Sequence, residues 1–336
     1  MGLLTLLFAG TSSLISFKYS LYYLFKKVTI EIVKKLKQWR KSAGHIYNIN
    51  GTSETIRNET VITERIKLIS VHVPIHLKPI NDDQFGHYLA GLIDGAGHFN
   101  NKKELIIIFH SLNLSLAYFV KKRLGFGKVR KIKDKDTCFL IVTADKGIQK
   151  IINLINGKIR TENIYNQIIN SIFYNNQCIA CAERLDSIDA FNNNKTIDFT
   201  FNSNKNLQNH WLAGFTDAHS NFQIKIINDH NKNTKIELNF HINQKCNNIL
   251  LLIQKFLGGN ISLKKKDNTY DYNSISFGSA KKVINYFDDF HLLSNKHINY
   301  LKWRKVYIII QNREHLTEID INKINRFKQS MNDDSV

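Results

Sequence analysis

Cysteine is scarce in this chain of 336 residues, which contains four. Cys178 and Cys181 have the spacing of two zinc ligands, but no second pair with matching spacing follows, which argues against a four-ligand zinc site. Together with Cys138 and Cys246 they form no pattern that indicates a disulfide framework. The sequence therefore predicts a protein of a reducing compartment, with no metal held by its cysteines.

Proline is scarcer still, because only Pro74 and Pro79 occur. Proline cannot continue a helix and biases the residue before it to extended structure. The pair therefore predicts a domain boundary near residues 80–84. Asn81 follows directly and is a candidate N-cap for the next helix.

The chain also lacks a long uninterrupted hydrophobic run. Residues 1–25 are apolar and free of acids, but Gly10 and Lys18 break them below the roughly 20 residues that a spanning helix needs. No stable membrane insertion is expected, and this segment is either a targeting leader or a docking segment. Residues 26–41 combine lysines with apolar residues at helical spacing. Such a helix buries its apolar stripe against a partner, which favours docking.

Acidic residues are outnumbered, with 28 against 47 Lys and Arg, a formal net charge of +19 and a pI near 9.6. An excess of this size is typical of proteins that bind nucleic acid, and an anionic membrane surface is the alternative. Asn, Lys, Ile, Phe and Tyr are abundant whereas methionine is rare. This bias indicates translation of an AT-rich genome such as that of an organelle.

A stretch of thirteen residues organises the chain because it occurs twice. Residues 87–99 read HYLAGLIDGAGHF and residues 210–222 read HWLAGFTDAHSNF, with Gly91 and Gly214 at equivalent places 123 residues apart. A repeat of this length indicates two copies of one domain rather than a solenoid. Small residues let helix axes approach more closely than the usual ~8–10 Å, so the two copies are expected to pack on each other. The residues expected at this contact are Leu89, Ala90, Gly91, Leu212, Ala213 and Gly214.

The order of elements is expected to be helix, two strands, helix, two strands, helix, and the second half repeats the first. Alternation of apolar and polar residues along 221–226 and 235–243 predicts half-buried antiparallel strands. Further strands are predicted at Lys128–Lys133, Asn260–Lys266 and Tyr272–Gly278. The predicted organisation is a basic N-terminal extension and linker (1–80), a first domain (81–174), an Asn-rich linker (175–206) and a second domain (207–330).

Both copies of the repeated stretch resemble the signature motif of the LAGLIDADG homing endonucleases and intron maturases, in the mitochondrial form with two motifs on one chain. The resemblance covers roughly residues 84–325. It implies an α/β (α+β) fold in which two pseudo-symmetric αββαββα domains pack through their motif helices. It also implies a pseudo-symmetric monomer whose two antiparallel sheets form a saddle over nucleic acid.

The resemblance also implies a site for divalent metals, held by an acidic residue at the eighth position of each motif. Ala96 and His219 occupy these positions here. Mg²⁺ requires oxygen ligands; alanine offers none, and imidazole suits zinc or copper. Asp94 and Asp217 remain two residues earlier and are expected to be cap or turn residues. The chain is therefore expected not to be an enzyme and to need no cofactor, with Mg²⁺ required only if the endonuclease alternative holds.

Two further residues are carried over weakly from the family. Gln244 corresponds to a residue that helps to position water near the metals, and Lys158 to a basic residue close to the scissile phosphate. The second-half counterpart of Lys158, near Ser294 and Lys296, does not align cleanly.

The candidate binding surface is the polar side of the predicted strands. Amide, hydroxyl and ammonium groups there suit hydrogen bonds to base edges and phosphates, and Glu237 is the only acid expected on the outward face of the second sheet. The candidate nucleic-acid-binding residues are Lys102, Lys103, Lys128, Arg130, Lys131, Lys133, Lys135, Asn221, Gln223, Lys225, Lys235, Asn239, His241, Lys264, Lys265 and Lys266, with Asn243 and Ser262 on the same face.

The expected function is binding of structured RNA without cleavage, in the mitochondrial matrix. The protein would act as an intron-splicing maturase or as a component of a ribonucleoprotein such as the mitochondrial ribosome, with ribosomal proteins and ribosomal RNA as partners. The alternatives are an active or metal-altered DNA endonuclease that uses His219, and a DNA-binding protein.

Overall fold

The computed structural model describes residues 68–132, 135–174, 198–228, 234–313 and 317–333. Contacts divide the chain into the units 1–65 and 66–336, and all described residues belong to the second unit. Residues 68–80, assigned above to the extension, are thus part of this unit. The predicted leader and basic helix, the Cys178–Cys181 pair and Lys133 lie outside the described residues. No described helix combines the length and apolar character needed to cross a membrane.

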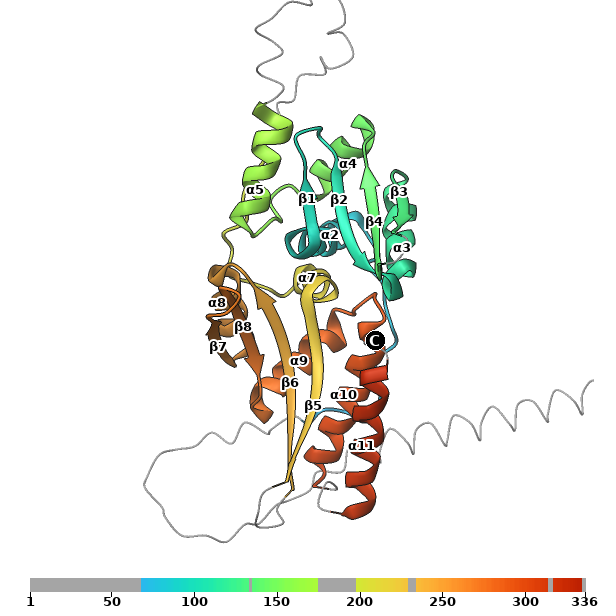
Figure 1. Ribbon diagram of the computed structural model, residues 1–336, viewed down its shortest axis with the longest axis vertical. Coiled ribbons are helices and arrows are strands. Elements are labelled where there is room, and N and C mark those ends of the chain that lie inside the picture. Colours follow the sequence, from blue (N-terminus) through green and yellow to red (C-terminus); the bar gives the residue numbers. More distant parts are fainter. Residues whose placement is uncertain (1–67, 133–134, 175–197, 229–233, 314–316, 334–336) are drawn as a thin grey trace, which may run out of the picture. The chain divides into compact units, whose positions relative to one another are not determined.

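The two halves of the unit contain equivalent series of elements (Figure 1). The first half comprises α2 (Asp82–Ala96), β1 (Gly97–Phe99), β2 (Leu105–His110), α3 (Leu114–Leu124), β3 (Lys128–Lys131), β4 (Thr137–Val142), α4 (Asp145–Ile155) and α5 (Glu162–Ile168). The second comprises α7 (Trp211–His219), β5 (Ser220–Asn228), β6 (Thr234–Gln244), α8 (Asn247–Leu257), β7 (Asn260–Lys264), β8 (Thr269–Ser274), α9 (Phe277–Asp289), α10 (Lys296–Gln311) and α11 (Glu318–Asp333).

Each half is built on one antiparallel sheet of four strands, ordered β1-β2-β4-β3 in the first and β5-β6-β8-β7 in the second. The identical order shows that the repeat in the sequence is a repeat of the fold. Helices cover one face of each sheet, and that face carries the apolar members of the alternating strands, such as Leu238, Phe240 and Ile242. The predicted fold class is confirmed.

The motif helices α2 and α7 lie side by side between the two sheets (Figure 1). A Cβ atom placed on Gly91 would lie 1.8 Å from the Trp211 carbonyl oxygen, and one on Gly214 would lie 1.9 Å from the Tyr88 carbonyl oxygen. No side chain larger than hydrogen fits at either position. The backbones of the two helices therefore touch at the two glycines.

Local residues set the boundaries of several elements, and the predicted N-cap at Asn81 is confirmed. Asn81 caps α2 through its side chain, which accepts a hydrogen bond of 2.8 Å from the Gln84 N–H. Helix α3 ends at Leu124 because Gly125 adopts a left-handed conformation with φ of 79°, which glycine reaches without steric cost. Strand β8 begins three residues earlier than predicted, and β7 ends at Lys264, because residues 265–268 form the turn between them.

Two extended segments lie against the helices of the unit. The segment 68–80 follows α10 in the opposite direction: Ile69 and the Gln311 amide exchange hydrogen bonds of 2.9 and 3.0 Å, and Arg304 Nη2 donates to the His72 carbonyl at 3.2 Å. Residues 198–206, from the predicted linker, bind the first half in the same manner. The Arg160 guanidinium donates there to the carbonyls of Asn204 and Asn206.

Candidate nucleic-acid interface

The second sheet presents a polar face opposite its helices. Paired residues in an antiparallel sheet lie on the same face, and β5 pairs with β6 at Asn221–His241, Gln223–Asn239 and Lys225–Glu237. The face continues through β8 and the edge strand β7. The structure thus brings together Asn221, Gln223, Lys225, Lys235, Asn239, His241, Asn243, Asn260, Ser262 and Lys264.

This face contains a second acid that the sequence analysis did not place there. Asp271 pairs with Asn243, whose Nδ2 donates to it at 2.6 Å, and the His241 Nε2 atom lies 3.2 Å from it. Burial opposes ionisation, but these two contacts hold the pKa of Asp271 below its usual value. The expectation that Glu237 is the only outward acid was therefore wrong, because β8 begins before Asp271.

Some of the lysines named as candidates are already paired. Lys235 Nζ lies 2.7 Å from Glu237, and Lys264 Nζ lies 2.6 Å from Asp267. Lys265 and Lys266 lie in the exposed turn after β7 rather than on the strand. Lys225 is exposed on β5. The charges available for phosphate contacts in this half thus lie on β5 and on the β7–β8 turn.

The equivalent face of the first sheet is apolar at its centre. Ile106 pairs with Ile141, and Ile108 pairs with Phe139; Ile108 has 47% of its surface exposed. Charge is confined to the rim. Lys102 and Lys103 lie in the β1–β2 turn, Lys128 and Arg130 on the edge strand β3, and Lys135 in the β3–β4 turn. Lys131 does not belong to this face. It pairs with Cys138, whose side chain is buried on the opposite face of the sheet.

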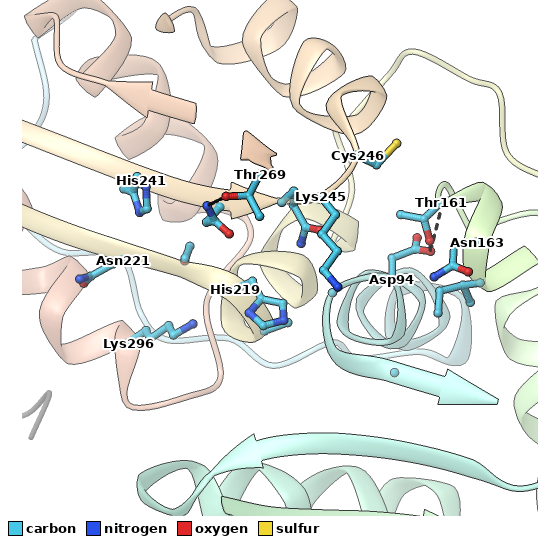
Figure 2. A pocket seen from close by; sticks show the side chains of 17 residues that line it. Asp94, Thr161, Asn163, His219, Asn221, His241, Lys245, Cys246, Thr269 and Lys296 are labelled. Carbon is cyan, nitrogen blue, oxygen red and sulfur yellow. Dashed lines mark hydrogen bonds between the residues drawn. The ribbon is translucent and has the colours of Figure 1, made fainter. Parts of the chain in front are cut away.

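A cavity of about 870 Å³ opens where the C-terminal ends of α2 and α7 meet the second sheet (Figure 2). Asp94 and His219 line it from the two motif helices. His241 and Gln244 line it from β6, and Lys296 from the first turn of α10. Lys245, which the sequence analysis did not single out, also lines it. The cavity is therefore the place where the family resemblance implies metals and a scissile phosphate.

Asp94 carries the only carboxylate among the described residues that line this cavity, and its oxygens are engaged. It accepts hydrogen bonds from the backbone N–H of Arg160 (2.9 Å), from the Thr161 Oγ1 hydroxyl (2.6 Å) and from Trp211 Nε1 (2.8 Å). Burial raises the pKa of Asp94 to about 6, although these donors oppose the rise. Its role is to fix the loop after α4 and the opposite motif helix.

Asp217 repeats this arrangement in the second half. It accepts from the Leu293 N–H (2.8 Å), the Ser294 Oγ hydroxyl (2.5 Å) and the Tyr88 hydroxyl (2.6 Å). Burial likewise raises the pKa of Asp217. Each motif aspartate is thus bonded to a side chain of the other half, which is a more specific arrangement than the cap or turn expected from the sequence.

The eighth motif positions provide no oxygen ligand. The Ala96 methyl group packs partly buried against the core, and His219 is exposed at the cavity. Desolvation lowers the pKa of His219, and the Lys296 charge lowers it further. The cavity therefore contains an imidazole at a position where Mg²⁺ would need a carboxylate.

Lys296 places an ammonium group at the end of the second motif helix. Its Nζ donates to the Thr216 carbonyl at 3.0 Å, and Figure 2 shows the side chain directed toward His219. Burial lowers the pKa of Lys296 to about 8, while the nearby Asp217 opposes the change. A cation is favoured at a helix C-terminus, so lysine here occupies a place that suits a positive charge.

Lys158 does not reach the cavity. Its Nζ bonds the Leu154 carbonyl at 3.1 Å and lies 3.2 Å from Asp83, in the first turn of α2 and thus at the far end of that helix. The loops that Asp94 and Asp217 bind occupy equivalent places in the two halves, and they show why Lys158 was assigned to the wrong position. Asp94 holds Thr161 and Asp217 holds Ser294, so Lys296 corresponds to Asn163 rather than to Lys158. Alignment of the residues bonded by the two aspartates would have identified Lys296.

The fold and this site can be compared with known proteins. A family model described as "LAGLIDADG endonuclease" matches residues 212–307. Over 329 residues, 97% of this chain and 96% of the relative, the sequence is 54% identical to an "Uncharacterized cox1 intron-2 37.2 kDa protein" of Schizosaccharomyces pombe. The chain belongs to the LAGLIDADG homing endonuclease family. The resemblance that the two motifs indicated is thereby confirmed.

Two groups of proteins resemble this LAGLIDADG protein at lower identity. It is 28% identical to "Intron-encoded DNA endonuclease aI3" of Saccharomyces cerevisiae, over 69% of this chain and 65% of that protein. I-SmaMI, solved bound to an uncleaved DNA target with calcium ions, matches 74% of this chain and 98% of its own with a TM-score of 0.54 and 21% identity. The structure of I-LtrWI, solved bound to target DNA, matches 75% of this chain and 98% of the I-LtrWI chain, with a TM-score of 0.55 and 20% identity. These likenesses establish a shared fold.

Proposed function

We propose that this LAGLIDADG protein binds structured RNA in mitochondria, as a maturase of the intron that encodes it, and does not cleave phosphodiester bonds. The observation that carries the proposal is the cavity at the ends of the motif helices. The eighth motif positions hold Ala96 and His219 instead of a pair of carboxylates. His219 and Lys296 line the cavity.

The cavity is unsuited to Mg²⁺ for two reasons. The ion needs several oxygen ligands in octahedral geometry, and the carboxylate of Asp94 is already occupied by donors from Arg160, Thr161 and Trp211. The Lys296 ammonium adds a repulsive charge in a partly enclosed space, where electrostatic interactions are stronger than in water. Metal-assisted hydrolysis of the family's type therefore lacks its ligands.

A metal-altered endonuclease that uses His219 receives no support from the geometry. Zinc bound for catalysis takes three protein ligands. Within the part of the chain that the structure describes, His219 belongs to no group of three His, Cys, Asp or Glu side chains close enough to share an ion. A solitary imidazole does not make such a site.

The difference between the two sheets favours RNA over a long DNA duplex. The outward face of the second sheet carries amides and lysines, whereas that of the first has Ile108 and Phe139 at its centre and basic residues along its rim. Hydrogen-bond readout of a duplex would then be available to one half only. Apolar and aromatic side chains with surrounding positive charge suit unpaired bases, which stack on such surfaces in structured and single-stranded RNA.

The identity of the RNA is proposed from the relatives. A protein 54% identical over nearly the full chain is named after an intron of cox1, which favours intron RNA over the ribosomal RNA of the other hypothesis. The mitochondrial location agrees with this and with the composition expected of an AT-rich organelle genome. A ribosomal role predicts co-sedimentation with ribosomal subunits instead.

The deciding experiment uses the full-length protein, the transcript of its own intron and a DNA library that contains the intron insertion site. We expect tight RNA binding, faster splicing of the transcript and no cut DNA in the presence of Mg²⁺. The double variant A96D/H219D serves as a comparison, because it restores carboxylates without touching the sheets. Efficient cutting of any library member by the unaltered protein would overturn the proposal. RNA binding without faster splicing would contradict the maturase role and favour a role as a ribonucleoprotein component.

Lys296 makes a pH-dependent contribution to RNA binding on this proposal. Because the pKa of Lys296 is lowered to about 8, its ammonium is largely protonated at pH 7 and largely lost at pH 9. A hydrogen bond from a charged donor contributes roughly 1.5 kcal/mol or more, so the Kd should rise about tenfold across this interval. His219 does not titrate there, since its pKa lies below the usual histidine value.

The matched variant is K296R, because arginine keeps its charge throughout this range. Titration of RNA by fluorescence anisotropy should show a flat Kd for this variant between pH 7 and pH 9. An equal pH dependence in both proteins would assign the effect to another group and would remove Lys296 from the contact.

A further inference from the structure

Three histidines distant in the sequence meet beside α10. His76 comes from the extended segment 68–80, and His291 and His297 flank the α9–α10 turn. Their ring centroids lie 4.3 to 5.7 Å apart, and one nitrogen from each lies within 4.8 Å of the others. Among the described residues this is the one group of three or more metal-ligating side chains.

The hydrogen bonds leave lone pairs available in this cluster. His76 Nε2 contacts the Leu292 carbonyl at 2.8 Å; a carbonyl only accepts, so Nε2 carries the proton and Nδ1 has a free lone pair. His291 and His297 both have a buried Nδ1 atom without a hydrogen-bond partner among the described residues. His291 is 3% exposed. Buried polar atoms without a partner are rare in folded proteins and call for an explanation such as a missing ion.

We propose that His76, His291 and His297 bind one Zn²⁺ ion. Imidazole nitrogen suits zinc and related transition metals, and sets of three histidines with water in the fourth position are found in zinc proteins. Nitrogens bonded to one tetrahedral zinc at ~2.0–2.1 Å lie about 3.3 Å apart. Since the three nitrogens lie within 4.8 Å of one another, each pair has to approach by at most about 1.5 Å. The exposed His76 and the partly buried His297 side chains can make this adjustment around the buried His291.

An outer-shell contact already fixes one of the three rings. Neutral imidazole is the form of histidine that binds a metal ion. The Leu292 carbonyl holds the His76 ring, and an outer-shell hydrogen bond of this kind orients a metal-bound histidine.

The site would join two parts of the chain that other contacts already bring together. Arg304 and Gln311 bind the segment before His76, whereas Leu293 and Ser294, next to His291, bind Asp217. A bound ion would therefore hold segment 68–80 to the loop that supports the second motif helix. This structural role is independent of the RNA proposed above.

The test uses the full-length protein without a histidine tag, freed of metal by a chelator and titrated calorimetrically with Zn²⁺ alone. We expect one equivalent to bind and the thermal midpoint of unfolding to rise. H76Q should weaken binding by at least ~100-fold, since loss of even an outer-shell partner costs about 10–100-fold. The control is H72Q, which removes an exposed histidine from the same segment and should bind zinc as the unaltered protein does.

Co²⁺ provides an independent readout, because a tetrahedral site with nitrogen ligands has a visible absorption spectrum that exposed single histidines do not produce. The spectrum should disappear in H76Q and in H297Q. Since His76 is exposed, H76Q should keep its midpoint of unfolding in the absence of metal. Failure of the unaltered protein to bind zinc, or unchanged binding by H76Q, would overturn the proposal and leave the histidines as a packing cluster.

Discussion

Replacement of Gly214 by alanine is expected to lower the free energy of unfolding by about 3 kcal/mol or more, toward the upper end of what overpacking of a core costs. The new Cβ would lie 1.9 Å from the Tyr88 carbonyl oxygen and 2.9 Å from the Leu92 nitrogen. Both neighbours are backbone atoms of α2, so no side chain can rotate away. G91A should act in the same way through the Trp211 carbonyl at 1.8 Å.

The matched control is G278A in the first turn of α9, where a Cβ meets no atom within 4 Å. Alanine at an unstrained helical position should leave stability unchanged or raise it by up to about 1 kcal/mol. Urea unfolding followed by circular dichroism measures all three variants. Equal stabilities of G214A and G278A would show that the motif helices are not in backbone contact.

Affinity for RNA is expected to fall steeply with salt. A protein that contacts 6–10 phosphates loses about 10³–10⁵ in affinity between 50 and 200 mM salt, with a logarithmic slope near −0.7 to −0.9 per phosphate. The net charge of +19 and the exposed Lys225, Lys265 and Lys266 on the second half lead us to expect a salt dependence of this size. A slope near zero would mean that the basic residues only keep the surface hydrated.

The location of the phosphate contacts can be tested with two double variants of equal charge. K225Q/K265Q alters the polar face and its adjoining turn, and should reduce the salt slope by about 1.4–1.8. K255Q/K282Q removes two exposed lysines from α8 and α9, which cover the opposite face of the same sheet, and should leave the slope nearly unchanged. Equal reductions would assign binding to overall charge rather than to this face.

The fold could be predicted from the sequence because its main determinants are local or repeated. The period of two along residues 235–243 placed β6, and the side chain of Asn81 marked the start of α2. The spacing between Gly91 and Gly214 indicated two packed copies. These features need no knowledge of contacts between distant residues.

The site was less predictable because it depends on such contacts. Asp271 was missed because the predicted strand began at Tyr272, one residue too late. The outward face of the first sheet was expected to be basic, but Ile108 and Phe139 occupy its centre. The position of Lys296 follows from the hydrogen bonds of Asp217, which the sequence does not show. His76 and His291 are separated by more than 200 residues, and no local pattern relates them.

The reciprocal bonds of the motif helices have a consequence for how such a chain could arise. Gly91 rests on Trp211 as Gly214 rests on Tyr88, and Asp94 accepts from Trp211 as Asp217 accepts from Tyr88. Each contact is made twice with the roles exchanged, as in the isologous interface of a two-fold symmetric dimer. A chain with one half alone would present a self-complementary surface and would form a homodimer through it. The present protein contains the same two-fold arrangement within one chain, so its two sheets need not be identical: one is polar, and the other is apolar at its centre.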